Sequence, residues 1–96
     1  MDIYPKYRKR AIVPTRSAYN ELKDLRMNLF DALDVLENGY DCSRSKRSKG
    51  KIERCLRLNN HVTRVVVAEG QFVYPDGGIK EVYWLIHISV ETYKKR

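Results

Sequence analysis

The sequence has few of the residues from which small proteins build metal sites. It contains only two cysteines and two histidines among 96 residues. Cys42 and Cys55 have no second pair, and adding His61 and His87 does not complete a known zinc-ligand spacing. We therefore expect no metal ion and no cofactor.

Long apolar runs are lacking as well. No stretch approaches the roughly 20 apolar residues that a membrane-spanning helix needs. The N-terminal sequence MDIYPKYRKR also lacks the apolar core of a signal peptide. We expect a cytoplasmic protein that makes no membrane contact, and in that compartment Cys42 and Cys55 are predicted to be reduced thiols.

The glycine-rich and nucleophile motifs of common enzymes are missing. No G-x-x-x-x-G-K-[ST], G-x-G-x-x-G or G-x-S-x-G sequence occurs. The acidic residues cluster on the predicted helices at the spacing of a solvated face. A nucleotide-binding enzyme and a glycosidase are therefore poorly supported.

Positive charge is what the sequence has in excess, with 19 Lys and Arg against 12 Asp and Glu. The charge is segregated: segments 1–16 and 42–64 are strongly basic, while the segment between them is acidic. The densest run, SRSKRSKGK at 43–51, holds five basic residues. Such segregation creates a local potential that attracts polyanions. The alternative is a solvated connector in a protein that merely has a basic pI.

Hydrophobic spacing predicts two helices in a single domain, residues 15–96, which follows a basic extended arm at 1–14. Thr15 or Ser17 can cap the first helix, and Asn28 can cap the second. Gly39 is placed to end it. The apolar stripes recur at helical spacing: Ala18, Leu22 and Leu25 in the first helix, then Leu29, Ala32, Leu33 and Leu36. One continuous helix over 17–38 is the alternative.

A period of two follows the basic loop at 42–51 and predicts strands. The segments with this period are KIERCLRL (51–58), HVTRVVVAEG (61–70) and IKEVYWLIHIS (79–89). Asn59–Asn60 and the run from Pro75 to Gly78 are predicted turns. The order predicts an α+β fold, with two N-terminal helices packed on one face of a small antiparallel sheet of three to four strands in a meander. Trp84 is expected to face the helices.

Basic side chains of the loop and the strands are predicted to form one patch for nucleic acid. The predicted phosphate-binding residues are Arg44, Lys46, Arg47, Lys49, Lys51 and Arg57. Arginine binds phosphate through a bidentate fork, and each contact releases counterions. The seven tyrosines add surfaces on which single-stranded RNA can stack.

Three segments carry a resemblance to a known family: LRMNLFDALDVLENGYD (25–41), RVVVAE (64–69) and VYWLIHIS (82–89). Together with the order of helices, basic loop and antiparallel strands, they resemble the small RelE/ParE-like toxin superfamily. The resemblance is closest to an uncharacterised prokaryotic domain family assigned near that superfamily, and it covers residues 17–89. That family often opens its first helix with a histidine, whereas the helix here begins RSAYNELKD.

The resemblance implies a metal-independent ribonuclease or ribosome-dependent mRNA interferase of a toxin–antitoxin system. Its partners would be RNA or the ribosome and a cognate antitoxin protein. Carried over to this sequence, Arg54 and Arg64 would bind the scissile phosphate and stabilise its developing charge. His87 or Tyr93 would transfer protons. From the residues alone, a structural ion pair for Arg54 and a core position for His87 are the alternatives. A non-catalytic module that binds RNA, DNA or ribosomes is the alternative function.

We expect a variant with serine at positions 44, 46, 47 and 49 to bind nucleic acid more weakly than the unaltered protein. The slope of log affinity against log salt concentration should flatten by several counterions, because fewer phosphates are neutralised. The fold should survive, since exposed charges contribute little to stability. An unchanged slope would show that this segment makes no phosphate contacts.

Overall fold

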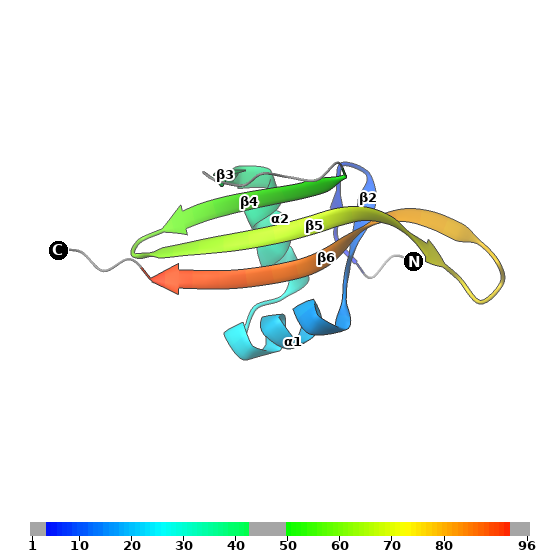
Figure 1. The fold of residues 1–96 in the computed structure, drawn as a ribbon, viewed down its shortest axis with the longest axis horizontal. Coiled ribbons are helices and arrows are strands. Elements are labelled where there is room, and N and C mark those ends of the chain that lie inside the picture. Colours follow the sequence, from blue (N-terminus) through cyan, green and yellow to red (C-terminus); the bar gives the residue numbers. More distant parts are fainter. Residues whose placement is uncertain (1–3, 43–49, 93–96) are drawn as a thin grey trace.

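One mixed sheet of six strands dominates the computed structural model, which describes residues 4–42 and 50–92 (Figure 1). The strands are β1 (Lys6–Tyr7), β2 (Arg10–Pro14), β3 (Tyr40–Asp41), β4 (Lys51–Leu58), β5 (His61–Val73) and β6 (Ile79–Thr92). Their order across the sheet is β1-β2-β6-β5-β4-β3. The β2–β6 pair is parallel, and the other neighbouring pairs are antiparallel.

The predicted fold class is wrong in its sheet. Strands take up 54% of the described residues, and the sheet is neither a meander nor limited to three or four strands. Two of the added strands come from the segment that was expected to be an extended arm, because Ile12 and Val13 are buried there against the rest of the protein. The parallel pairing of β2 with β6 joins segments about 70 residues apart, which local periodicity does not report.

The two predicted helices are present, with the predicted break between them. Helix α1 (Arg16–Leu25) begins after Thr15, whose hydroxyl accepts a hydrogen bond from the Ala18 amide. Helix α2 (Leu29–Asn38) begins after Asn28, which forms a capping box with Asp31. Each cap satisfies amides that the first turn leaves without partners.

Gly39 ends α2 as predicted, but its role is steric. A Cβ built on Gly39 would lie 2.4 Å from the carbonyl oxygens of both Cys55 and Val35. Its φ of −84° is ordinary, so the glycine is required by the close approach of the β4 backbone rather than by a left-handed conformation.

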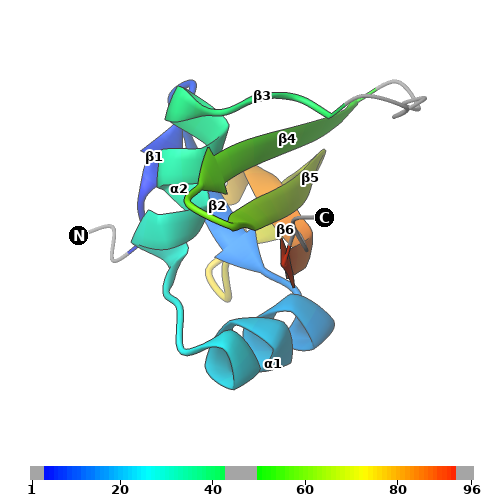
Figure 2. The ribbon, with the colours of Figure 1, turned by 90° about the vertical axis from the view of Figure 1, so that its left-hand side faces the viewer.

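The core lies between the helices and one face of the sheet. Figure 2 shows α2 standing against that face, with α1 lying below it. The largest fully buried side chains are Ile12, Leu36, Val65, Val67, Leu85 and Ile88. The helix stripes contribute as predicted: Leu22 and Leu36 are buried, and Leu25 and Leu33 pack against the same cluster.

Cys42 and Cys55 form a disulfide, so the prediction of two reduced thiols is wrong. Strand β3 pairs Tyr40 with Cys55, which brings Cys42, two residues further along, diagonally opposite Cys55. The two Cα atoms are 5.4 Å apart, within the usual range for a disulfide. The sequence gives no sign of this pairing because β3 has only two residues.

Trp84 faces away from the helices, contrary to expectation. Its strand neighbours Tyr83 and Leu85 belong to the helix-facing core, and adjacent residues of a strand point to opposite faces. Its indole ring lies over Gly70 of β5, where a Cβ would be 2.4 Å from the Trp84 Cδ1 atom. Gly70 is therefore the position that makes room for the ring.

Replacing Gly70 by alanine should displace this indole. We expect the free energy of unfolding to fall by about 1–3 kcal/mol, the usual effect of overpacking, and the emission maximum of the sole tryptophan to shift to longer wavelength. Gly78→Ala is the control, because its added Cβ meets mainly the flexible Asp76 carboxylate. An unchanged emission spectrum in Gly70→Ala would contradict the placement of Trp84.

Candidate nucleic-acid interface

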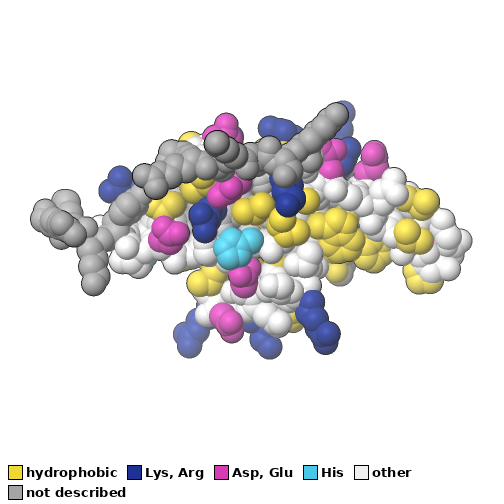
Figure 3. Space-filling model, viewed as in Figure 1, with side chains coloured by type: hydrophobic (Ala, Val, Ile, Leu, Met, Phe, Trp, Pro, Cys, Tyr) yellow, Lys and Arg dark blue, Asp and Glu magenta, His cyan; other side chains and the backbone are white. Residues whose placement is uncertain are grey.

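The sheet face that carries neither helix, here called the open face, brings together several of the predicted site residues. Cross-strand pairing defines its members on the three longest strands: Lys51, Glu53, Cys55 and Arg57 on β4; Val62, Arg64, Val66, Ala68, Gly70 and Phe72 on β5; and Lys80, Val82, Trp84, His87, Ser89 and Glu91 on β6. In Figure 3 this face shows a histidine beside acidic side chains, with an apolar area running toward the β5–β6 hairpin.

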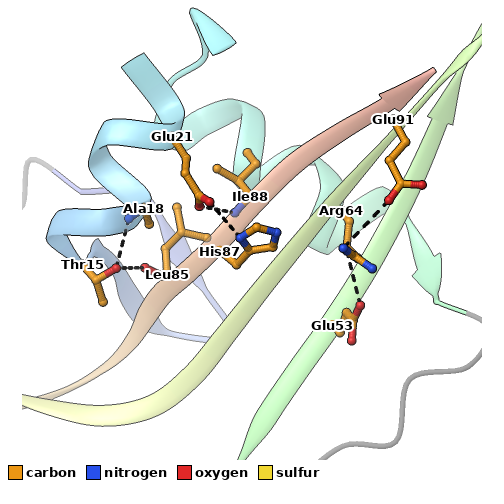
Figure 4. Close-up of polar contacts among 9 residues, drawn as sticks. All are labelled: Thr15, Ala18, Glu21, Glu53, Arg64, Leu85, His87, Ile88 and Glu91. Atoms are coloured by element: carbon orange, nitrogen blue, oxygen red, sulfur yellow. Dashed lines mark hydrogen bonds and ion pairs between the residues drawn. The ribbon is translucent and has the colours of Figure 1, made fainter. Parts of the chain in front are cut away.

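Arg64 stands on the open face between two carboxylates. Its Nε atom is 3.6 Å from Glu53 Oε2, and one terminal nitrogen is 3.9 Å from Glu91 Oε1 (Figure 4). Both separations exceed ordinary hydrogen-bond lengths, so the attraction is electrostatic and partly screened by solvent. The side chain is 39% exposed and is accessible to an anionic ligand.

His87 lies on the same face, where α1 meets β6. Its Nδ1 atom is 2.9 Å from Glu21 Oε2, while Glu21 Oε1 accepts a hydrogen bond from the Ile88 amide at 3.0 Å. Glu21 thereby holds both the imidazole and the β6 backbone (Figure 4). His87 pairs with Val66, and Ser89 pairs with Arg64. Since Val66 and Arg64 are two residues apart on β5, the imidazole and the guanidinium lie on one face of the sheet.

Arg54 lies on the opposite face, so the structure does not bring it together with Arg64. One terminal nitrogen of Arg54 donates to Asp41 Oδ1 at 3.1 Å, and the other donates to the Gly39 carbonyl. These bonds fasten the end of α2 and strand β3 to β4. The structural ion pair that was the alternative for Arg54 is present, although with an acid of β3 rather than of a helix.

The other predicted binding residues divide into two groups. Lys51 and Arg57 are exposed at the two ends of β4, on the open face. The remaining positions lie outside the described residues: Arg44, Lys46, Arg47, Lys49 and Tyr93.

A row of three aromatic rings on the open face was missed by the sequence reasoning. The Phe72 ring centroid is 6.1 Å from that of Trp84 and 5.1 Å from that of Tyr74. Tyr74 is 38% exposed, and the other two rings are partly exposed. The available signal was the spacing of Phe72 and Tyr74, because residues two apart in an extended segment share a face. We call these three residues the aromatic row.

The described part of the chain has neither a cluster of metal-binding side chains nor a helix suited to crossing a membrane. Residues 4–42 and 50–92 contain no group of three or more His, Cys, Asp or Glu side chains placed to hold a metal ion. In the same ranges, neither helix combines the length and the apolar character needed to cross a membrane.

Comparisons with protein-family models, with curated proteins and with solved structures found no match to this chain. The resemblance to the RelE/ParE-like superfamily therefore stays a prediction.

Proposed function

We propose that this protein is a non-catalytic module that binds single-stranded RNA on the open face of its sheet. The aromatic row carries the proposal. Every base has a flat π-face, so partly exposed rings beside one another on the β5–β6 hairpin offer stacking sites that tolerate any sequence. Bases paired in a duplex are already stacked on one another and cannot stack on the rings, so the row selects single strands.

Cations at the margins of the row supply the second element of such a surface. Lys80 lies directly across from Phe72 in the β5–β6 ladder, and Arg64 stands further along the same face. Single-stranded sites combine stacking rings with positive charge that follows the phosphates. Lys51 adds charge at the first residue of β4.

Replacing both Phe72 and Tyr74 by alanine should weaken binding of a fluorescent ten-nucleotide oligouridine by at least about tenfold. A base stacked on an aromatic side chain contributes about 1–3 kcal/mol, and about 1.4 kcal/mol corresponds to a factor of ten. Fluorescence anisotropy measures the affinity, and quenching of Trp84 by the oligonucleotide reports on the row itself.

The same hairpin provides a matched control. Val73 lies between Phe72 and Tyr74, points to the other face of the hairpin and is 63% exposed. Replacing it by alanine removes apolar surface from the same element and should leave the affinity unchanged. Equal weakening in this variant and in the double variant would indicate general damage to the hairpin and would remove the support for stacking.

Ribonuclease activity is a second candidate, favoured by the position of His87 between Glu21 and the Arg64 side of the open face. In such a reaction the 2′-oxygen attacks phosphorus, the 5′-oxygen leaves, and a cyclic phosphate forms. His87, oriented by Glu21, would accept the 2′-hydroxyl proton, and solvent would return a proton to the leaving oxygen. Arg64 would stabilise the charge on the phosphoryl oxygens.

The candidate predicts that Arg64→Ala slows RNA cleavage by about 10²–10³-fold and that His87→Gln slows it by about 10²–10⁴-fold. The measurement is the yield of fragments ending in 2′,3′-cyclic phosphate or 3′-phosphate, from RNA alone and from translating ribosomes. Arg16→Ala, which alters an exposed cation of α1, is the control. Equal cleavage by all three variants would come from a contaminant, and RNA binding would then be the only function that the open face supports.

The proposed partners and compartment rest on different observations. A cytoplasmic location and a cognate antitoxin were predicted from the sequence and the resemblance. The Cys42–Cys55 disulfide favours an oxidising environment instead, because thiols in the cytoplasm of most organisms are kept reduced. RNA is the partner for which the open face itself gives support.

A further inference from the structure

A basic cleft lies at the edge of the sheet, between the β1–β2 turn and the first residues of β6. The cleft has a volume of about 420 Å³. Five basic residues and one acidic residue line it together with two apolar ones: Lys6, Arg8, Lys9, Arg10, Lys80, Glu81, Ala11 and Ile79. None of these basic residues belongs to the phosphate-binding set predicted from the sequence, although the segment 1–16 is strongly basic.

The turn at the mouth of the cleft has an unfavourable backbone for its residues. Tyr7 pairs with Arg10, so Arg8 and Lys9 are the two central residues, with φ angles of 51° and 69°. Two positive φ angles belong to the type I′ hairpin turn, in which Asn-Gly is the common choice. Long side chains disfavour this region. Arg8 and Lys9 therefore occupy a backbone conformation that is unfavourable for them. Residues in such unfavourable conformations concentrate at functional sites.

Neighbouring contacts hold the turn in place. Arg10 lies 3.2 Å from Glu69 and 3.5 Å from Glu81, and its guanidinium sits over the Tyr83 ring at 5.4 Å. Arg10 is therefore occupied in joining β2 to β5 and β6. Arg8 and Lys9 differ: they are exposed, and no salt bridge within the described ranges involves either side chain. The Arg8 guanidinium lies over the Tyr7 ring at 5.1 Å, which leaves its hydrogen-bond donors directed to solvent.

We propose that the β1–β2 turn is a phosphate-binding site in which Arg8 and Lys9 contact the phosphate oxygens. Arginine supplies a planar fork and lysine a point charge, both suited to phosphate. The remaining cations of the cleft raise the local potential. This assignment of a phosphate group requires neither the aromatic row nor the open face.

The phosphate is supplied by the backbone of a bound single strand, and this part of the inference rests on the proposed function. Lys80 lines the cleft and also lies directly across from Phe72 of the aromatic row. The cleft and the row are thus neighbours along β6. A strand whose bases stack on the row would run toward this edge, where Arg8 and Lys9 would contact its phosphates.

Three double variants test the site. Arg8→Asn with Lys9→Gly removes both charges and installs the preferred turn sequence. Arg8→Gln with Lys9→Gln removes the charges and keeps the strained turn. Arg16→Gln with Lys23→Gln removes two exposed cations from α1 and is the charge-matched control. The probes are inorganic phosphate, followed through backbone amide signals in NMR, and a ten-nucleotide oligouridine, followed by anisotropy at several salt concentrations.

We expect phosphate to shift the amide signals of Arg8 and Lys9 in the unaltered protein. Both turn variants should lower the oligouridine affinity and flatten its salt slope by roughly 1.4, the amount for two phosphates on a single strand. The control variant should change neither. The Asn-Gly variant should also melt several degrees higher, about 4–8 °C for each kcal/mol of strain removed.

Each remaining outcome decides a specific point. Equal weakening by the turn variants and the control would show that binding depends on net charge alone, which would overturn the site. The site would also be overturned if the turn variants kept both the oligouridine affinity and the phosphate-induced shifts of the unaltered protein. Phosphate shifts without any oligouridine binding would keep the site and overturn the RNA-binding function. Oligouridine weakening without shifts by free phosphate would assign the site to the polymer backbone. A melting temperature that does not rise in the Asn-Gly variant would overturn the claim of strain.

Discussion

The structure depends on how the backbone amides and carbonyls on the two edges of the long strand β6 find hydrogen-bond partners. Strand β5 pairs with one edge along nearly its whole length, and β2 pairs with the other from Val82 to Leu85. There β2 stops, because both the amide and the hydroxyl of Thr15 donate to the Leu85 carbonyl. The chain turns into α1, and Glu21 accepts the Ile88 amide further along the same edge. Helix, hairpin and sheet are therefore joined at one strand, and a backbone edge that would invite intermolecular pairing is covered.

An irregularity in β6 decides which side chains meet on each face. The β5–β6 register shifts between Val66 and Val67, which pair with His87 and Leu85 and leave Ile86 as the extra residue. Leu85 and Ile88 are three positions apart, so in a regular strand they would point to opposite faces. The bulge lets both enter the core, and it equally places Trp84 and His87 together on the open face. The composition of the candidate site is thus a consequence of packing the core.

The accuracy of the sequence reasoning followed the range of the interactions involved. The helix break and the caps at Thr15 and Asn28 were predictable because a cap acts within a few residues. The parallel β2–β6 pairing, the disulfide and the side on which Trp84 lies were not predictable. The first two join distant segments, and the third depends on a bulge that shifts the alternation of β6 by one residue. The basic N-terminal segment was recognised as charged, but its folding into a turn beside Lys80 required the tertiary structure.

The arginines of the sheet show why a count of charges is a poor guide to a binding surface. Arg54 is bonded to Asp41, Arg10 lies between Glu69 and Glu81, and Arg64 lies between Glu53 and Glu91. Each of these cations lies beside a compensating acid of a neighbouring strand, so it adds little to the long-range field of the sheet and can act on a phosphate only by direct contact. Partly exposed pairs of this kind also contribute little to stability. Among the described residues, Arg8 and Lys9 of the β1–β2 turn differ, because they are exposed and take part in no salt bridge. The potential of a surface is therefore better judged from the pairing of each cation than from the number of cations in the sequence.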